Sequence, residues 1–175
     1  MGEDLFVTPD GWTSPLGTLA VGGQRYPCVL GRSGVTGDKR EGDLKTPIGD
    51  FALRRLHYRA DRMARPRTGL PVSAIGTDDG WCDDPGHSDY NGPVKLPFDA
   101  SHERLWRDDH VYDLVVEIGY NDDLPVPGRG SAIFLHVARD DRAGTEGCVA
   151  LARVDLLGAL EKISAGSRIR IRPPA

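Results

Sequence analysis

A cysteine and a histidine in the last third of the chain are the residues best suited to chemistry. Cys148 follows a glycine at the start of a short apolar run, and His136 lies twelve residues earlier in an apolar segment. An imidazole that takes a thiol proton creates a thiolate nucleophile, and nearby backbone N–H groups can stabilise an oxyanion. The spacing is also compatible with a buried structural cysteine and a histidine satisfied by a carbonyl.

The segments around this pair are predicted to be β-strands. Residues 111–118 and 131–138, the latter containing His136, are rich in apolar and β-branched side chains. Gly22-Gly23 separates two short apolar segments, which is typical of a two-residue hairpin turn. The other expected elements are a strand at 51–58, a helix of about ten residues between Leu151 and Gly166, and an edge strand at 167–172.

Residues 61–110 are predicted to form long, ordered loops. This region alternates prolines with charged residues, yet aromatic side chains are spread through it and would anchor it to a core: Trp81, Tyr90, Phe98 and Trp106. Extended loops in a compact domain commonly carry function. We therefore expect this region to contribute to a binding site.

Composition narrows the class of protein. A chain of 175 residues is expected to form one domain, residues 1–175. The net charge of −4 disfavours a dedicated nucleic-acid binder, because such affinity depends on neutralising phosphates. No apolar run approaches the ~18 residues of a membrane span. The first residues show no export signal, which keeps a cytoplasmic location open beside the cell envelope or periplasm.

Two sequence motifs resemble those of a known enzyme family. Leu135-His136-Val137, followed after a loop by Thr145-Glu146-Gly147-Cys148-Val149-Ala150-Leu151, is similar to the catalytic signature of the YkuD-type L,D-transpeptidases. The upstream stretch from Gly42 to Phe51, GDLKTPIGDF, resembles that family's other familiar motif. The resemblance implies a mainly β fold: a mixed β-sandwich with one helix after the cysteine and long ordered loops.

The resemblance also assigns catalytic roles. It implies that Cys148 is the nucleophile and His136 the general base, with no cofactor and no metal. It implies that the backbone N–H of Cys148, together with that of Gly147 or Glu146, stabilises the oxyanion. The group that orients His136 is not readable from the sequence, and in this family it can be a backbone carbonyl.

The chain departs from the better-known family members at three points. Glu146 stands where a histidine is usual, Ala150 stands where a polar or basic residue is usual, and the loop from His136 to Cys148 is shorter. The chain therefore resembles a smaller, divergent branch of the family, in which the reaction class is expected to persist better than the choice of donor or acceptor.

The residue that would hold the substrate's carboxylates is therefore missing from its usual place. Arg129 and Arg139, on either side of the His136 segment, are the nearest candidates. Tyr120 and Asn121 end the preceding strand and are candidates to line the same cleft, although an asparagine there is also typical of a turn.

The expected activity is acyl transfer on peptidoglycan stem peptides. Cys148 would attack the amide after the L-centre of the third residue, release D-alanine and form a thioester. An amine acceptor gives a cross-link, whereas water makes the same site an L,D-carboxypeptidase of wall recycling. Carbapenem-type β-lactams are expected as covalent inhibitors. Donor length, acceptor, compartment and oligomeric state are left open by the sequence.

Two other classes of function compete with this interpretation. A metal peptidase is suggested by the histidines and carboxylates of residues 101–110, but the segment has no tight His-Glu-x-x-His motif. A non-catalytic peptidoglycan-binding domain is the other. Among the remaining thiols, Cys82 is disfavoured as a nucleophile because two carboxylates follow it, and Cys28 is expected in the core. An odd number of cysteines also excludes a complete disulfide framework.

Overall fold

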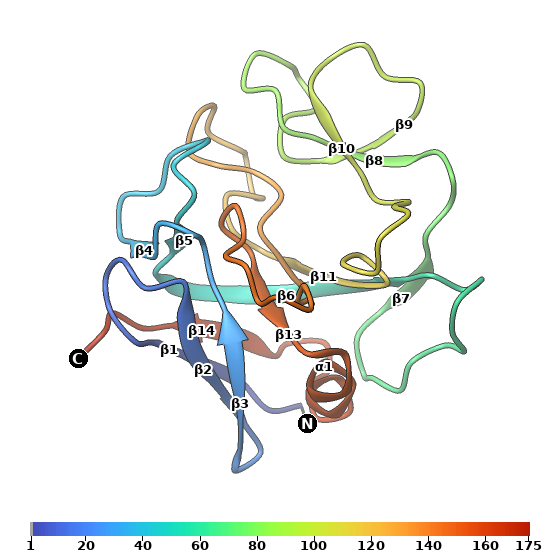
Figure 1. Cartoon of the computed structure of the whole chain (residues 1–175). Coiled ribbons are helices and arrows are strands. Elements are labelled where there is room, and N and C mark those ends of the chain that lie inside the picture. The colour runs from blue at the N-terminus through green and yellow to red at the C-terminus, as the bar shows by residue number, and fades with distance from the viewer. Residues whose placement is uncertain (1) are drawn as a thin grey trace.

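The computed structural model describes residues 2–175, and β-strands dominate it (Figure 1). The mainly β class is therefore confirmed. The strands are β1 Leu5–Pro9, β2 Leu16–Val21, β3 Gln24–Val29, β4 Val35–Thr36, β5 Thr46–Pro47, β6 Gly49–Tyr58, β7 Val72–Ala74, β8 Asp79–Cys82, β9 Pro93–Lys95, β10 His102–Arg104, β11 Leu114–Ile118, β12 Phe134–Val137, β13 Val149–Leu151 and β14 Arg168–Ile171, and the helix is α1 Arg153–Leu160.

Nine strands form one sheet that closes on itself. Its order is β11-β12-β13-β3-β2-β1-β14-β6-β7, and β6 pairs in addition with β11 at the opposite end of that order. Strand β6 can do so because its ten residues pair with β14 near the start and with β11 and β7 near the end. The two layers of the expected sandwich are therefore joined around the main hydrophobic core.

The predicted hairpin is confirmed by the pairing of β2 with β3. Gly22 and Gly23 form the turn, with φ of +56° and +74°. Positive φ at both turn positions favours glycine because a Cβ atom would crowd the backbone. The hairpin places Cys28 fully inside the core, as expected, and its pairing with β13 supports the strand that follows Cys148.

The helix predicted after Leu151 is present but ends earlier than its spacing suggested. Helix α1 buries Leu156 and Leu160 against the sheet, whereas Val154 is 75% exposed. In the described part of the chain, no helix is long and apolar enough to cross a membrane.

The predicted edge strand near the C-terminus is an interior strand, so that expectation was wrong. Strand β14 lies between β1, which is parallel to it, and β6, which is antiparallel. Its arginines do reach the outer face, where Arg170 pairs with Asp4 and Asp50, each at 2.7 Å. Alternation of charged and apolar residues reports a half-buried strand, but it does not report whether both edges are paired.

A separate three-stranded sheet forms a cap, defined here as residues 79–104. Its strand order is β10-β8-β9, and Figure 1 shows it standing away from the nine-stranded sheet. A second hydrophobic cluster joins cap to sheet, and in it the rings of Trp81 and Phe134 meet edge-on with centroids 5.2 Å apart. The aromatic anchors predicted for this region are thus partly confirmed, since Trp81 and Tyr90 are buried.

Candidate active site

One surface groove contains both members of the predicted Cys–His pair. The groove has a volume of about 630 Å³, and Cys148 and His136 in its wall are 7% and 6% exposed. His136 pairs with Ala150 in the parallel β12–β13 ladder, and Cys148 precedes Ala150 by two residues. Because side chains alternate along a strand, the thiol and the imidazole lie on the same face.

The thiol of Cys148 is held by main-chain groups that lead into β12. Its Sγ donates to the carbonyl of Ala132 at 3.2 Å and accepts from the N–H of Phe134 at 3.4 Å. Burial, and after it the charge of Glu103, raises the pKa of Cys148 well above its ordinary value. In the free protein, Cys148 is therefore a neutral thiol at pH 7.

His136 offers one basic nitrogen to the groove. Its Nδ1 lies 2.9 Å from the main-chain carbonyl of Val137, and because a carbonyl only accepts, Nδ1 carries the proton. Nε2 is then the basic nitrogen. Tyr112 packs edge-on against the imidazole, with ring centroids 5.3 Å apart. Burial lowers the pKa of His136 to about 4, so the ring is neutral at pH 7.

The backbone N–H groups of residues 146–148 differ in whether they already have a hydrogen-bond acceptor. The N–H of Gly147 donates to the hydroxyl of Thr145 at 3.1 Å. Within residues 2–175, the N–H groups of Glu146 and Cys148 have no hydrogen-bond acceptor. Gly147 adopts a φ of +134°, and a Cβ atom on it would lie 2.9 Å from the carbonyl oxygen of Lys45. A side chain at position 147 would therefore displace the backbone that carries the thiol.

The two motifs singled out in the sequence meet at Cys148. Thr46, from the upstream motif, donates its hydroxyl to the carbonyl of Cys148 at 3.3 Å and accepts the N–H of Gly31 at 2.8 Å. Thr145 donates to the same carbonyl at 2.7 Å. The upstream motif thus fixes the main chain at Cys148.

The cap contributes Glu103 to the wall of the groove. Its Oε2 accepts the hydroxyl of Tyr112 at 2.6 Å, so the cap is tied to the ring that packs on His136. Burial raises the pKa of Glu103, and Asp83 and Glu146 add to the shift. A carboxyl group with raised proton affinity therefore stands beside the Cys–His pair.

Asn91 connects the base of the cap to the segment that holds the thiol. Its Oδ1 accepts from the indole N–H of Trp81 at 3.1 Å and from the N–H of Ala132 at 3.0 Å. Its Nδ2 donates to the carbonyls of Tyr120 at 3.0 Å and Asn121 at 2.7 Å. Since the carbonyl of Ala132 accepts the Cys148 thiol proton, Asn91 supports the main chain that holds this thiol.

Comparison with known proteins gives one match. The family model for the YkuD L,D-transpeptidase catalytic domain matches residues 18–171, which is nearly the whole chain. The chain belongs to the YkuD family. It has no significant match among curated proteins, and none among solved structures. YkuD domains act on peptidoglycan, so an L,D-transpeptidase-type activity on peptidoglycan is the general function that membership supports.

The four candidate substrate-binding residues differ in whether they line the groove. Arg139 lines the groove. Arg129 instead pairs with Asp38 at 3.1 Å, and Tyr120 donates its hydroxyl to the carbonyl of Arg129. Asn121 is a turn residue with φ of +51°, and its amide bonds the main chain of residues 126 and 130. Of these four, only Arg139 is among the residues that line the groove.

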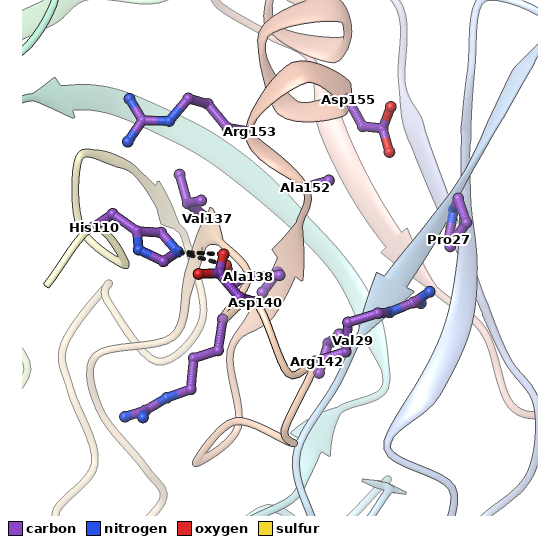
Figure 2. A pocket seen from close by; sticks show the side chains of 12 residues that line it. Pro27, Val29, His110, Val137, Ala138, Asp140, Arg142, Ala152, Arg153 and Asp155 are labelled. Atoms are coloured by element: carbon purple, nitrogen blue, oxygen red, sulfur yellow. Dashed lines mark hydrogen bonds and ion pairs between the residues drawn. The ribbon is translucent and has the colours of Figure 1, made fainter.

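A second cavity adjoins the YkuD groove but contains no nucleophile among its lining residues. Its volume is about 570 Å³, and it shares Arg139 and Ala150 with the groove. Figure 2 shows Arg153 and Asp155 at the start of α1 on one side, with His110 held by Asp140 at 3.4 Å. The Cys–His pair therefore selects the groove as the candidate active site.

The histidines of residues 101–110, which suggested a metal site, contact different main-chain carbonyls. His102 bonds the carbonyl of Ala100 at 2.8 Å, and His110 lies 3.2 Å from the carbonyl of Ala138. In residues 2–175, no group of three or more His, Cys, Asp or Glu side chains is arranged to hold a metal ion. All three cysteines are free thiols, and burial raises the pKa of Cys28 to about 12.

Sequence reasoning did not assign roles in this YkuD site to several residues. Tyr112 was expected only as part of a strand, Glu103 only as one of the carboxylates of residues 101–110 that suggested a metal peptidase, and Asn91 was not singled out. The signal for Asn91 is an Asn-Gly step directly after the aromatic anchor Tyr90, which predicts a turn but not the four hydrogen bonds of its side chain.

Proposed function

We propose that this chain is an L,D-transpeptidase that works by covalent catalysis at Cys148. Its substrate is a peptidoglycan stem peptide, and the bond cleaved is the amide after the L-centre of the third residue. The observation that carries the proposal is the joint placement of Cys148 and His136 in one groove, with the Nδ1 proton of His136 held by the carbonyl of Val137.

The proton affinities favour general-base catalysis over a preformed ion pair. Burial raises the pKa of Cys148 and lowers the pKa of His136 to about 4, so both groups begin neutral. As the sulfur attacks the amide carbonyl, its proton passes to Nε2 of His136. The N–H groups of Cys148 and Glu146, which have no other acceptor in the described residues, stabilise the oxyanion. The N–H of Gly147 is not an oxyanion donor in this proposal, because it is bonded to the hydroxyl of Thr145. The role of Gly147 is to allow the backbone conformation before Cys148.

Collapse of the tetrahedral intermediate completes the first half of the reaction. The C–N bond breaks, the proton on His136 passes to the leaving D-alanine amine, and a thioester remains on Cys148. An acceptor amine then attacks the thioester carbonyl, loses a proton to His136 and displaces the sulfur, which recovers its proton. Arg139 at the groove wall is suited to a substrate carboxylate, because it forms no ion pair within residues 2–175.

Product analysis tests this proposal directly. Purified tetrapeptide stems would be incubated with the protein, and the products identified by mass. The proposal predicts D-alanine release together with a cross-linked dimer, and Cys148→Ala should reduce both at least about a thousandfold. Release of D-alanine that persists in Cys148→Ala would contradict it. Release of tripeptide without any dimer would still support Cys148 as the nucleophile, but it would show that water, and not an amine, attacks the thioester.

A further inference from the structure

The carboxylates that line the groove differ in what they already bind. Glu41 accepts the hydroxyls of Tyr90 and Ser131. Glu146 pairs with Arg32 at 3.7 Å. These two acidic side chains are therefore occupied by partners of the fold itself.

Glu103 and Asp83, which also line the groove, are only partly satisfied. Tyr112 occupies Oε2 of Glu103, and within residues 2–175 Oε1 has no hydrogen-bond donor. The Oδ1 of Asp83 is buried and likewise has no partner in that part of the chain. Most buried acceptors in proteins are paired, so Oδ1 of Asp83 is an exception, and Oε1 of Glu103 is the acceptor left for a donor that enters the groove.

The register of the cap sheet brings these two carboxylates together. Glu103 pairs with Trp81 across the β8–β10 ladder, and the N–H of Asp83 bonds the carbonyl of Ser101 at 3.1 Å. Asp83 and Glu103 are therefore diagonal neighbours on one face of the cap. Two carboxylates in this arrangement create a negative potential that a cation would relieve.

Arg107, whose charge acts on Glu103, does not supply that cation as an ion-pair partner. The guanidinium of Arg107 lies 5.2 Å from the centre of the Tyr112 ring, but its Nε and Nη2 donate to the two oxygens of Asp109 at 2.9 Å and 2.6 Å. Neither Glu103 nor Asp83 forms an ion pair with any residue from 2 to 175. Arg32, Arg104, Arg107 and Arg139 also line the groove, but none of them is in ion-pair contact with either carboxylate.

We propose that Glu103, assisted by Asp83, binds the ammonium group of the acceptor amine. This inference rests on the proposed transpeptidase function and adds the residue that selects an amine over water in the second step. An ammonium has three donors and one positive charge, which match the unpaired oxygens. Once bound, it gives one proton to the Glu103 carboxylate, and the neutral amine that results attacks the thioester and passes its second proton to His136. Glu103 shares the groove with Cys148 and touches Tyr112, the ring against His136, so an amine held there is close to the thioester.

The experiment measures how the acyl-enzyme divides between amine and water. Wild type and Glu103→Gln would receive a tetrapeptide donor and an acceptor stem with a free side-chain amine, and dimer and tripeptide would be quantified. The glutamine keeps an oxygen for Tyr112 but loses the charge. We expect the dimer-to-tripeptide ratio to fall about tenfold, the usual effect of losing one charge-assisted hydrogen bond. Thioester formation, followed by intact mass without acceptor, should not fall with the ratio, because loss of the Glu103 charge removes one of the causes that raise the pKa of Cys148.

Matched variants separate recognition from a general effect of charge. Asp99→Asn makes the same charge change at an exposed position of the cap outside the groove, and it should leave the ratio unchanged. Asp83→Asn is the second test variant and covers the case in which Glu103→Gln does not fold. It should lower the ratio in the same direction.

Each alternative result has a distinct meaning. An unchanged ratio in both folded variants, or equal losses of thioester formation and of both products, would overturn the inference. A wild type that forms the thioester but never a dimer would also overturn it, while leaving Cys148 as the nucleophile. A wild type that forms no thioester would instead refute the proposed function.

Discussion

The main-chain carbonyl of Val137 accepts the Nδ1 proton of His136 at 2.9 Å. This contact is made by the residue next to the histidine in the same strand, so no separate acidic side chain is needed to orient the ring. The chosen tautomer leaves Nε2 as the basic nitrogen beside the Cys148 groove. Burial lowers the pKa of His136 to about 4, and the contact with the Val137 carbonyl offsets part of that shift.

Burial of His136 predicts a loss of stability in acid. The folded pKa of about 4 lies below the unfolded value near 6.5, so the unfolded chain binds more protons between these values. The free energy of unfolding should fall by about 3 kcal/mol through this group as pH drops from about 6.5 to about 4. His136→Gln lacks this term. Denaturant titrations at pH 7.5 and 4.5 should therefore show a smaller change in unfolding free energy in the variant than in the wild type. An equal change in both proteins would contradict the assignment.

The raised pKa of Cys148 predicts a thiol that is slow to react in the free protein. Burial and the Glu103 charge favour the protonated thiol, and His136 is neutral, so no thiolate–imidazolium pair forms at pH 7. Alkylation of Cys148 by iodoacetamide, measured by peptide mapping, should accelerate steadily with pH through 9. A fast reaction with a plateau below pH 7 would indicate a preformed ion pair instead.

Gly147 is predicted to be required for activity beyond its effect on stability. An alanine there meets an unfavourable φ of +134° and the carbonyl of Lys45, so the backbone of Cys148 must move. Gly147→Ala should cost about 1–3 kcal/mol and reduce turnover about a hundredfold. Gly166→Ala is the matched control, because Gly166 has a φ of +95° but open space around it. Comparable turnover in the two variants would contradict this role.

Asn91 is predicted to be a key residue of the cap base. Asn91→Ala would leave the N–H groups of Trp81 and Ala132 without their acceptor. It would also leave the carbonyls of Tyr120 and Asn121 without the donor that Asn91 supplies. We expect a loss of about 3 kcal/mol in unfolding free energy and weaker acylation of Cys148. Ser88→Ala, at an exposed cap position, should stay within about 0.5 kcal/mol. A small effect of Asn91→Ala in denaturant titrations would argue against this network.

The sequence predicted individual strands and turns better than it predicted which strands pair with one another. The hairpin around Gly22-Gly23 depends on turn chemistry within a few residues, and it is confirmed. The position of β14 depends on β1 and β6, which lie more than 100 residues away, and alternation in Arg168–Ile171 carries no information about them. The expectation of an edge strand failed for that reason.

The residues of the candidate site also differ in whether local sequence could predict them. Cys148 and His136 were found because a motif preserves their order, and the fold places them in one groove. Their assignment as nucleophile and base stays a prediction. Glu103 and Tyr112 escaped because their hydrogen bond joins a cap strand to the segment before β11, and residue types alone do not encode such a meeting. The single-domain boundaries and the compartment also remain predictions.

Acylation of Cys148 is the most direct test of the central claim. The chain would be incubated with a carbapenem-type β-lactam, and the adduct followed by intact-mass spectrometry and peptide mapping. The proposed thioester chemistry predicts one adduct per chain, located on Cys148 and absent from Cys148→Ala, while Cys28 and Cys82 stay free. An unmodified protein after long incubation, or an adduct that persists in Cys148→Ala, would contradict it.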